Sequence, residues 1–169
     1  MILFSETQKF RQWWIWAIIL IVIGFQVNLL YHEFEKGSPE IKKVLLLTFV
    51  HVLVVLIFLY SKLSTEITEN EIMYKFFPFN WSKKSVLWVD VERAYVRTYN
   101  PILEYGGWGY RFGLFGKGRA LNVSGNVGLQ LELKNGKKIL IGTKKQEELK
   151  LVIVNLEKKL RRSLVQNQN

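Results

Sequence analysis

The sequence predicts an α+β protein, in which a hairpin of two transmembrane helices is followed by a small curved antiparallel sheet or open barrel and a C-terminal helix. Three observations lead to this prediction. Two apolar runs of about 20 residues lie between Trp13 and Tyr60, long enough for a helix to cross a hydrocarbon core of about 30 Å. After Ser64 apolar and polar residues alternate, which is typical of half-buried strands. Near the C-terminus apolar residues recur at helical spacing.

The apolar region divides into two spans and a link. The first span is expected at residues 13–31, the link at 32–38 and the second span at 39–61. So short a link makes the two helices antiparallel neighbours. Amphipathic rings settle at the headgroup level of a bilayer. The expected interface anchors are therefore Trp13, Trp14, Trp16, Tyr31 and Tyr60.

Both helix starts carry capping patterns. Ser5 and Gln8 fit a capping box, so a helix is expected to begin at about residue 6, within a juxtamembrane segment 1–12. Ser38 and Pro39 fit an N-cap and a first helical position.

The first run is too long for a signal peptide and lacks a small-residue cleavage site. We therefore interpret it as a retained anchor.

A few polar residues interrupt the apolar runs. Gln26 lies at a depth from which its side chain could hydrogen-bond across to Thr48 or His51. One interpretation is that these polar contacts join the two helices. The other makes His51 a proton-handling or ligand residue, because ionisable groups within membranes are often functional.

The charge is positive and concentrated after the second span. The net charge is +10, and the segment after Tyr60 holds 19 Lys and Arg residues against 10 Asp and Glu. Such a balance fits a domain kept soluble by surface lysines, a domain beside anionic lipid or a nucleic-acid-binding domain. The membrane tether argues against nucleic acid. The expected partners are the lipid bilayer, a protein partner or a second copy of this chain, and anionic lipid.

Localisation follows from the same features. The chain has no cysteine, which excludes a disulfide framework, a thiolate zinc site and a cysteine nucleophile. Two spans place both termini on one side of the membrane. Together with the basic domain and the lack of a cleavable signal, this favours a cytoplasmic (inner) membrane protein with its termini and domain in the cytoplasm.

The β-domain is expected at residues 64–163. Its clearest strand pair flanks Asn135-Gly136, a dipeptide that favours a type I′ hairpin turn. Thr143 and Gln146 fit a second capping box. An amphipathic helix is therefore expected at 144–163, followed by a disordered tail at 164–169.

A glycine-rich insert at residues 105–126 separates the earlier strands from this hairpin. It contains seven glycines, several aromatic residues and three cations. One interpretation is a long, bent strand pair, because glycine marks bulges and close backbone approach. The other is an anion or lipid-headgroup site formed by glycine N–H groups and by Arg111, Lys117 and Arg119. The insert contains neither phosphate-binding glycine fingerprint.

Groups for catalysis are sparse in the β-domain. Both histidines, His32 and His51, lie in the apolar region, and Asp90 is the only aspartate. No catalytic triad, paired carboxylates or metal-ligand spacing is present in the sequence. We therefore expect a protein that is not an enzyme and that uses no cofactor or metal.

Four segments carry a family resemblance: FRQWWIW, YGGWGYRFG, GKGRALNVSGN and GLQLELKNGKKILIGTKK. They resemble an uncharacterised bacterial membrane family in which a transmembrane hairpin precedes a PH-like domain. The resemblance covers most of the chain. It implies a PH-like split β-barrel of about seven antiparallel strands, capped by the C-terminal helix. Because a fold does not establish a function, the resemblance transfers no activity.

Three functions follow as hypotheses. The first is a non-catalytic binding or scaffold module that presents a basic PH-like domain to a protein partner at the membrane surface. The second is sensing of anionic lipid headgroups through the insert. The third is a membrane enzyme that acts on a lipid and uses His51.

Overall fold

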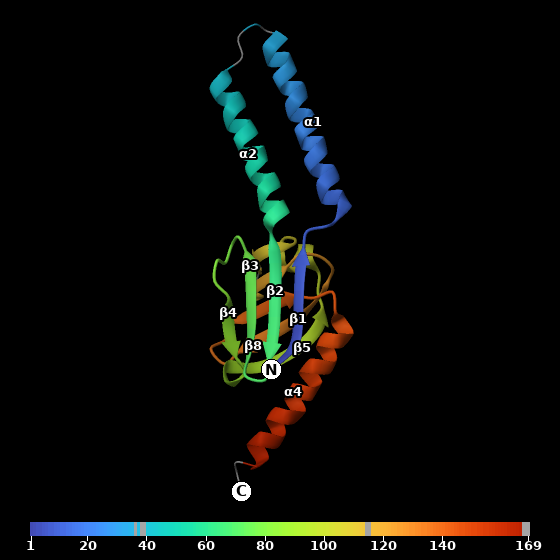
Figure 1. Ribbon diagram of the computed structural model, residues 1–169, viewed down its shortest axis with the longest axis vertical. Helices are drawn as coiled ribbons and strands as arrows, with labels where there is room; N and C mark the ends of the chain where they lie inside the picture. Colours follow the sequence, from blue (N-terminus) through green and yellow to red (C-terminus); the bar gives the residue numbers. More distant parts are fainter. Residues whose placement is uncertain (36, 38–39, 114–115, 167–169) are drawn as a thin grey trace. The chain divides into compact units, whose positions relative to one another are not determined.

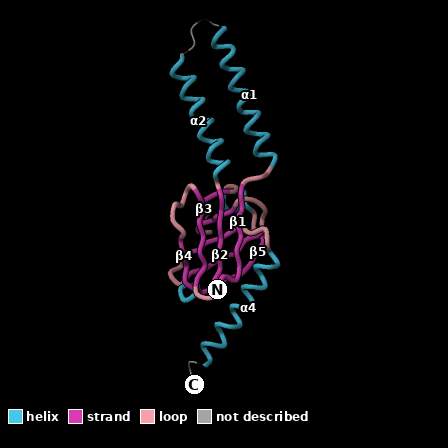
Figure 2. Tube along the Cα trace, viewed as in Figure 1, coloured by secondary structure: helices cyan, strands magenta, loops and turns pink. Residues whose placement is uncertain are grey.

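A computed structural model describes residues 1–35, 37, 40–113 and 116–166. The chain forms two compact units: a helical hairpin of residues 10–61, and a β-domain of residues 1–9 and 62–169. Figure 2 shows helix along both apolar segments and strands through the β-domain. The α+β class, the two apolar helices and the C-terminal helix are confirmed. The β-strands form two open sheets and no closed barrel.

The hairpin consists of helix α1 (Trp13–Glu35) and helix α2 (Ile41–Tyr60). Both are long and apolar enough to cross a membrane. Helix α1 continues four residues past the expected end of the first span. Helix α2 begins two residues later than expected, after Glu40, which makes no side-chain cap. The proposed cap, Ser38 and Pro39, lies outside the described residues.

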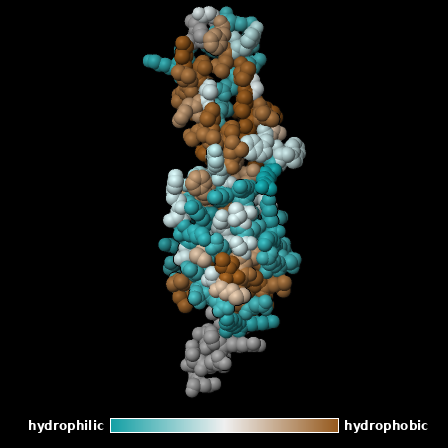
Figure 3. Space-filling model, in the orientation of Figure 1, coloured by the Kyte–Doolittle hydropathy of each residue, from teal (hydrophilic) through white to brown (hydrophobic). Residues whose placement is uncertain are grey.

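The apolar surfaces of these helices are exposed. Only Ile15 and Gln26 are buried in α1, and no residue is buried in α2. Figure 3 shows hydrophobic side chains along both helices. A helix that is apolar on every face needs an apolar environment around it, such as a protein interior or lipid.

The N-terminal segment is a strand, β1 (Ile2–Lys9), and not the helix expected from residue 6. Its side chains alternate between exposed and buried, with Phe4, Glu6 and Gln8 buried. It pairs antiparallel with the strand that follows α2. Pairing along the whole segment outweighs the four-residue capping pattern. The β-domain therefore includes the N-terminus and does not begin at residue 64.

The first sheet has the order β1-β2-β3-β4, with antiparallel neighbours. Its buried face carries Leu63, Ile67, Ile72 and Phe76, all inaccessible to solvent. The strands after β1 are β2 (Lys62–Thr68), β3 (Glu71–Phe77) and β4 (Lys84–Leu87).

The second sheet lies behind the first in Figure 1 and has the order β5-β8-β9-β7-β6. The turn η1 (Trp88–Asp90) leads from the first sheet into it. Leu121, Leu131 and Leu140 supply its most buried side chains. The strands are β5 (Val91–Thr98), β6 (Gly109–Phe112), β7 (Arg119–Asn122), β8 (Val127–Leu133) and β9 (Lys138–Gly142).

The described residues thus hold nine strands, where about seven antiparallel strands were expected. The N-terminus supplies β1, which was expected as a helix, and the glycine-rich insert supplies β6 and β7, the strand pair of one of the two interpretations. One pair, β7 with β9, is parallel. Parallel neighbours need a longer connection than a hairpin, and here β8 and its turns lie between them in sequence.

The hairpin expected at Asn135-Gly136 is present, but its loop has three residues. The Leu133 N–H donates to the Lys137 carbonyl at 2.9 Å, and the Gly136 N–H donates to the Leu133 carbonyl at 2.8 Å. Gly136 has a φ of 78°. This left-handed residue after a tight turn is the usual pattern of a three-residue hairpin loop.

The C-terminal helix α4 spans Gln146–Gln166. It begins two residues later than expected and includes 164–166, which were expected to be disordered; residues 167–169 lie outside the described part of the chain. Its buried side chains, Leu149, Ile153 and Leu156, follow the helical spacing predicted from sequence. The helix packs against β1, β5 and β8.

Strand β1 is joined to the start of α4 by buried hydrogen bonds. The Glu6 carboxylate accepts from the Thr143 hydroxyl at 2.6 Å and from the Lys144 N–H at 2.9 Å. The Gln8 amide donates to the Gly142 carbonyl at 2.7 Å. The Thr143 hydroxyl also accepts from the Lys145 N–H at 3.0 Å. The first ten residues thus fix the place where the last strand turns into the last helix.

Glu6→Ala is expected to destabilise the β-domain by about 1.5–3 kcal/mol, because it leaves two donors without their charged acceptor. The free energy of unfolding, measured by denaturant titration of the full chain in detergent, checks this. Glu92→Ala, an exposed carboxylate on β5, is the control. Equal stability of the two variants would contradict the role given to Glu6.

Candidate functional site

The glycine-rich insert forms the strand pair β6–β7, preceded by a short helix α3 (Pro101–Tyr105). The Asn100 side chain caps α3 by accepting from the N–H groups of Ile102 at 3.1 Å and Leu103 at 3.0 Å. Gly106 ends it in the left-handed conformation, at φ 69°. The strand-pair interpretation of the insert therefore describes its backbone; it leaves open what the three cations do.

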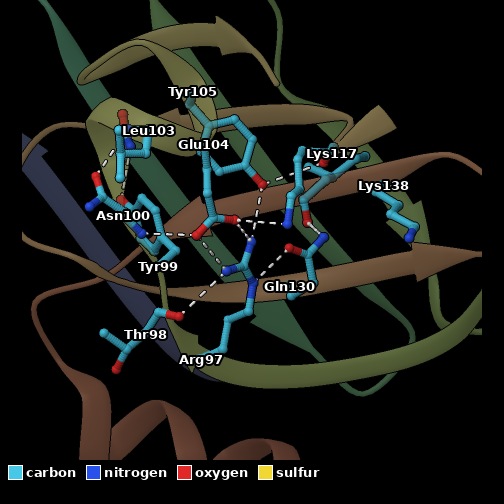
Figure 4. Close-up of polar contacts among 12 residues, drawn as sticks. Arg97, Thr98, Tyr99, Asn100, Leu103, Glu104, Tyr105, Lys117, Gln130 and Lys138 are labelled. Carbon is cyan, nitrogen blue, oxygen red and sulfur yellow. Dashed lines mark hydrogen bonds and ion pairs between the residues drawn. The ribbon is translucent and has the colours of Figure 1, made fainter. Parts of the chain in front are cut away.

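A polar network holds the insert against β5 and β8. Arg97 and Glu104 form a two-pronged ion pair, with Nη2 to Oε2 at 2.8 Å and Nη1 to Oε1 at 3.1 Å. The Arg97 Nε donates to the Gln130 amide oxygen at 3.1 Å, and Nη2 donates to the Tyr105 hydroxyl at 3.3 Å. Figure 4 shows these side chains converging from β5, α3 and β8.

The network changes the ionisation of its members. The hydrogen bond from Arg97 lowers the pKa of Glu104, against the opposing effect of burial. Burial opposes the charge on Arg97, but the bond to Glu104 still raises the pKa of Arg97. Burial raises the pKa of the neighbouring Tyr99 to about 12. Burial also raises the pKa of Tyr105. The Arg97–Glu104 pair is therefore charged, and Tyr99 and Tyr105 are neutral hydrogen-bonding groups near neutral pH.

Two of the three cations expected to bind an anion are engaged elsewhere. The Lys117 ammonium lies 3.7 Å from the Glu104 carboxylate, which partly compensates its charge. The Arg111 Nε donates to the Trp108 carbonyl at 3.0 Å. Of the three, only Arg119 lines the pocket described below.

Arg119, at the start of β7, has a different environment. Its guanidinium carbon lies 5.3 Å from the centres of both the Tyr110 and the Phe112 rings. Its Nε is buried and has no hydrogen-bond acceptor among the described residues. Within that part of the chain, no carboxylate is paired with Arg119. A buried polar atom without a partner is uncommon and calls for an explanation, such as a water or an ion.

A pocket of about 550 Å³ opens beside Arg119. The β6–β7 turn, the β8–β9 turn and Tyr74 of β3 line it, and the lining includes Lys137 and Lys138. Lys138 lies 3.9 Å from Glu132, at the limit of an ion pair. Sequence analysis did not name either lysine as a site residue, because both follow Asn135-Gly136 and lie outside the glycine-rich insert. The parallel pairing of β7 with β9 places them beside Arg119.

Two glycines of this region are required by packing. A Cβ on Gly118, which has a φ of 80°, would collide with the Lys138 carbonyl, and a Cβ on Gly113 would lie 2.5 Å from the Lys117 Cβ. The Gly113 N–H also donates to the Gly118 carbonyl at 2.6 Å. Gly118 lets the end of the β6–β7 turn lie directly against β9, and Gly113 lets the chain pass close to Lys117 and Tyr105.

The polar residues within the apolar helices make a long hydrogen bond between the helices and a contact within α2. The Gln26 amide donates to the Thr48 hydroxyl at 3.4 Å, a long hydrogen bond that joins α1 to α2. His51 is not part of this contact, because its Nδ1 lies 2.8 Å from the Leu47 carbonyl of its own helix. The described residues contain no group of three or more His, Asp and Glu placed to hold a metal.

The expected interface anchors all lie on the helices. Trp13 is the first residue of α1 and Tyr60 is the last residue of α2, and both are exposed. Tyr31 is also exposed, near the end of α1. The remaining two, Trp14 and Trp16, lie in the first turn of α1.

In comparisons with known proteins, no protein-family model, no curated protein and no solved structure matches this chain. The function is therefore argued from the geometry of the hairpin and of the β-domain.

Replacing Glu104 is expected to change how stability depends on pH. The pKa of Glu104 is lowered from 4.5 by folding, so its stabilising effect is present above the unfolded pKa and is lost as pH falls through the lower folded pKa. The wild-type chain should thus lose stability more steeply than Glu104→Gln between about pH 5 and about pH 3. Denaturant titrations across this range check the prediction, with exposed Glu147→Gln as the control. Parallel curves for wild type and Glu104→Gln would contradict it.

Proposed function

We propose that this chain is a membrane-anchored binding module. Its helical hairpin crosses the bilayer twice, and its β-domain is held at one face of the membrane, where it binds a protein partner without catalysing a reaction. The observation that carries this proposal is the site of the hairpin in the fold. Strand β1 ends at Lys9, β2 begins at Lys62, and these two residues are paired in the sheet. The hairpin is thus inserted between two neighbouring strands.

The segments that connect the strands to the helices are very short. Three residues separate β1 from α1, and one residue, Ser61, separates α2 from β2. An extended residue spans at most about 3.6 Å. A domain joined in this way to two membrane helices stays within a few residues of the lipid surface. This arrangement favours a role that depends on position at the membrane.

The exposed apolar surface of the hairpin supports the bilayer as its environment. The two helices leave nearly all their large apolar side chains unburied within the chain. Fully burying one such side chain contributes about 1.5–3 kcal/mol. Lipid provides that environment along the whole length of both helices.

One loop of the β-domain extends the proposed contact with lipid. Phe77 is paired with Lys62, so the loop after β3 begins at the end of the sheet where the chain leaves for the helices. In this loop Trp81 is 79% exposed and Phe79 is 53% exposed, and Lys83 and Lys84 follow. Tryptophan with nearby lysine suits the interface between headgroups and water. We infer that this loop contacts lipid.

The same proposal includes a PH-like fold and a cytoplasmic location for the β-domain. The resemblance to PH-like membrane proteins is supported by an order of a four-stranded sheet, a second sheet and a C-terminal helix. The cytoplasmic side is supported by the basic β-domain and by the absence of cysteine. A basic surface at the inner leaflet meets anionic lipid.

Removing the hairpin is expected to yield a soluble, folded β-domain. Residues 10–61 are replaced by Asn-Gly, which can join Lys9 to Lys62 in a two-residue hairpin turn, because these residues already form a pair. The full chain should stay in vesicles after an alkaline wash, and the shortened chain should be soluble with a cooperative unfolding transition.

Two outcomes would contradict the proposal. Release of the full chain from vesicles without detergent would show that the helices do not span the bilayer. A shortened chain that folds but still sediments with membranes would assign the anchor to the β-domain. A variant that keeps the helices but carries Trp81→Ala and Phe79→Ala is the control, since it should remain in the washed vesicles.

A further inference from the structure

The pocket beside Arg119 has an excess of positive charge, which is compensated only in part by Glu132, 3.9 Å from Lys138. Arg119, Lys137 and Lys138 line it, and no carboxylate is among its described lining residues. Arg97 and Arg119 differ in their hydrogen-bond partners. Arg97 is paired with Glu104, Gln130 and Tyr105, whereas among the described residues the side-chain interactions of Arg119 are with aromatic rings. An arginine whose buried Nε has no acceptor among the described residues, lining a pocket with two further cations, has the composition of an anion site.

We propose that this pocket binds a phosphate group, with Arg119 as its principal ligand and with Lys137 and Lys138 supplying further charge. The proposal rests on the binding function proposed above and gives that function a ligand class. A phosphate is favoured over a single carboxylate because its charge matches several cations at once. Guanidinium groups bind phosphate oxygens through two parallel hydrogen bonds, and lysine contributes as a point charge.

The pocket is held in shape before any ligand binds. The rings of Tyr110 and Phe112 lie against the Arg119 guanidinium, and Phe79 stacks on Tyr110 with ring centres 6.1 Å apart. Gly118 lets the turn lie against the Lys138 carbonyl. A guanidinium fixed by stacking loses less conformational entropy when it binds. The ligand then supplies the acceptor that the buried Nε lacks.

Two sources could present the phosphate: a lipid headgroup in the membrane and a soluble phosphate. Both use the same oxygens, so the geometry of the pocket suits either one. The experiment separates them by offering each source in turn to the full chain reconstituted in lipid nanodiscs, at constant ionic strength. Inorganic phosphate is titrated into phosphatidylcholine discs. Discs containing phosphatidic acid are prepared in parallel without added phosphate.

The readout is protection of single lysines from acetylation, measured by mass spectrometry. Lys137 and Lys138 line the pocket, and Lys134 lies on the same turn but outside the lining residues. Because the reactive free fraction falls as the site fills, a ligand at about ten times its dissociation constant should slow acetylation of Lys137 and Lys138 about tenfold. Acetylation of Lys134 should be unchanged. Protection by phosphate identifies a soluble source, and protection only in phosphatidic acid discs identifies a headgroup.

Arg119→Gln is expected to abolish this protection, and Arg111→Gln, whose side chain bonds to the Trp108 carbonyl, should retain it. If Arg119→Gln does not fold, Arg119→Lys keeps the charge but loses the planar pair of donors, and should weaken binding about tenfold. Absence of protection by both sources would overturn the proposal, as would equal losses in Arg111→Gln and Arg119→Gln. Such a failure would not contradict the proposed membrane anchor, because retention in washed vesicles tests the hairpin separately.

Discussion

The pairing of β1 with β2 is the constraint on which the rest of the structure depends. These strands are neighbours in one sheet, yet the entire helical hairpin lies between them in the sequence. The pairing places the N-terminus inside the β-domain, where Glu6 and Gln8 meet the start of the last helix. It also fixes where the chain leaves and re-enters the domain. The hairpin is thus joined to the domain at both of its ends, by two chain segments that belong to neighbouring strands.

Two arginines of the β-domain, Arg97 and Arg119, have different surroundings. Arg97 is neutralised by Glu104 and holds α3 against β5 and β8, a structural use of an ion pair whose geometry is two-pronged and well satisfied. Arg119 has aromatic contacts but no acceptor among the described residues. The insert therefore borders both a closed polar network, shared with β5, α3 and β8, and an open basic pocket, shared with the β8–β9 turn. The first keeps the strand pair in place, and the second is the site at which we propose that a ligand binds.

The features that the sequence predicted well are those with local signals. The apolar length of α1 and α2, the Asn-Gly turn and the helical spacing of Leu149, Ile153 and Leu156 all depend on neighbours in the chain. Strand β1 could not be predicted in this way, because two of its buried residues, Glu6 and Gln8, are polar and find their partners 137 and 134 residues away. Of the residues that line the pocket, the sequence pointed to Arg119 alone. Arg119 was named from its glycine-rich context, but its association with Lys138 depends on a parallel strand pair that has no sequence signature.

The insertion of the hairpin between two hydrogen-bonded strands has a consequence for biogenesis. If only one of the two helices crossed the bilayer, β1 and β2 would emerge on opposite faces and their seven paired positions, from Ile2 opposite Thr68 to Lys9 opposite Lys62, could not form. The Glu6 contact with Thr143 would be lost with them. If the hairpin spans the bilayer as proposed, an even number of crossings is therefore required for β1 and β2 to meet on one face. Folding of the β-domain would then depend on correct insertion of both helices.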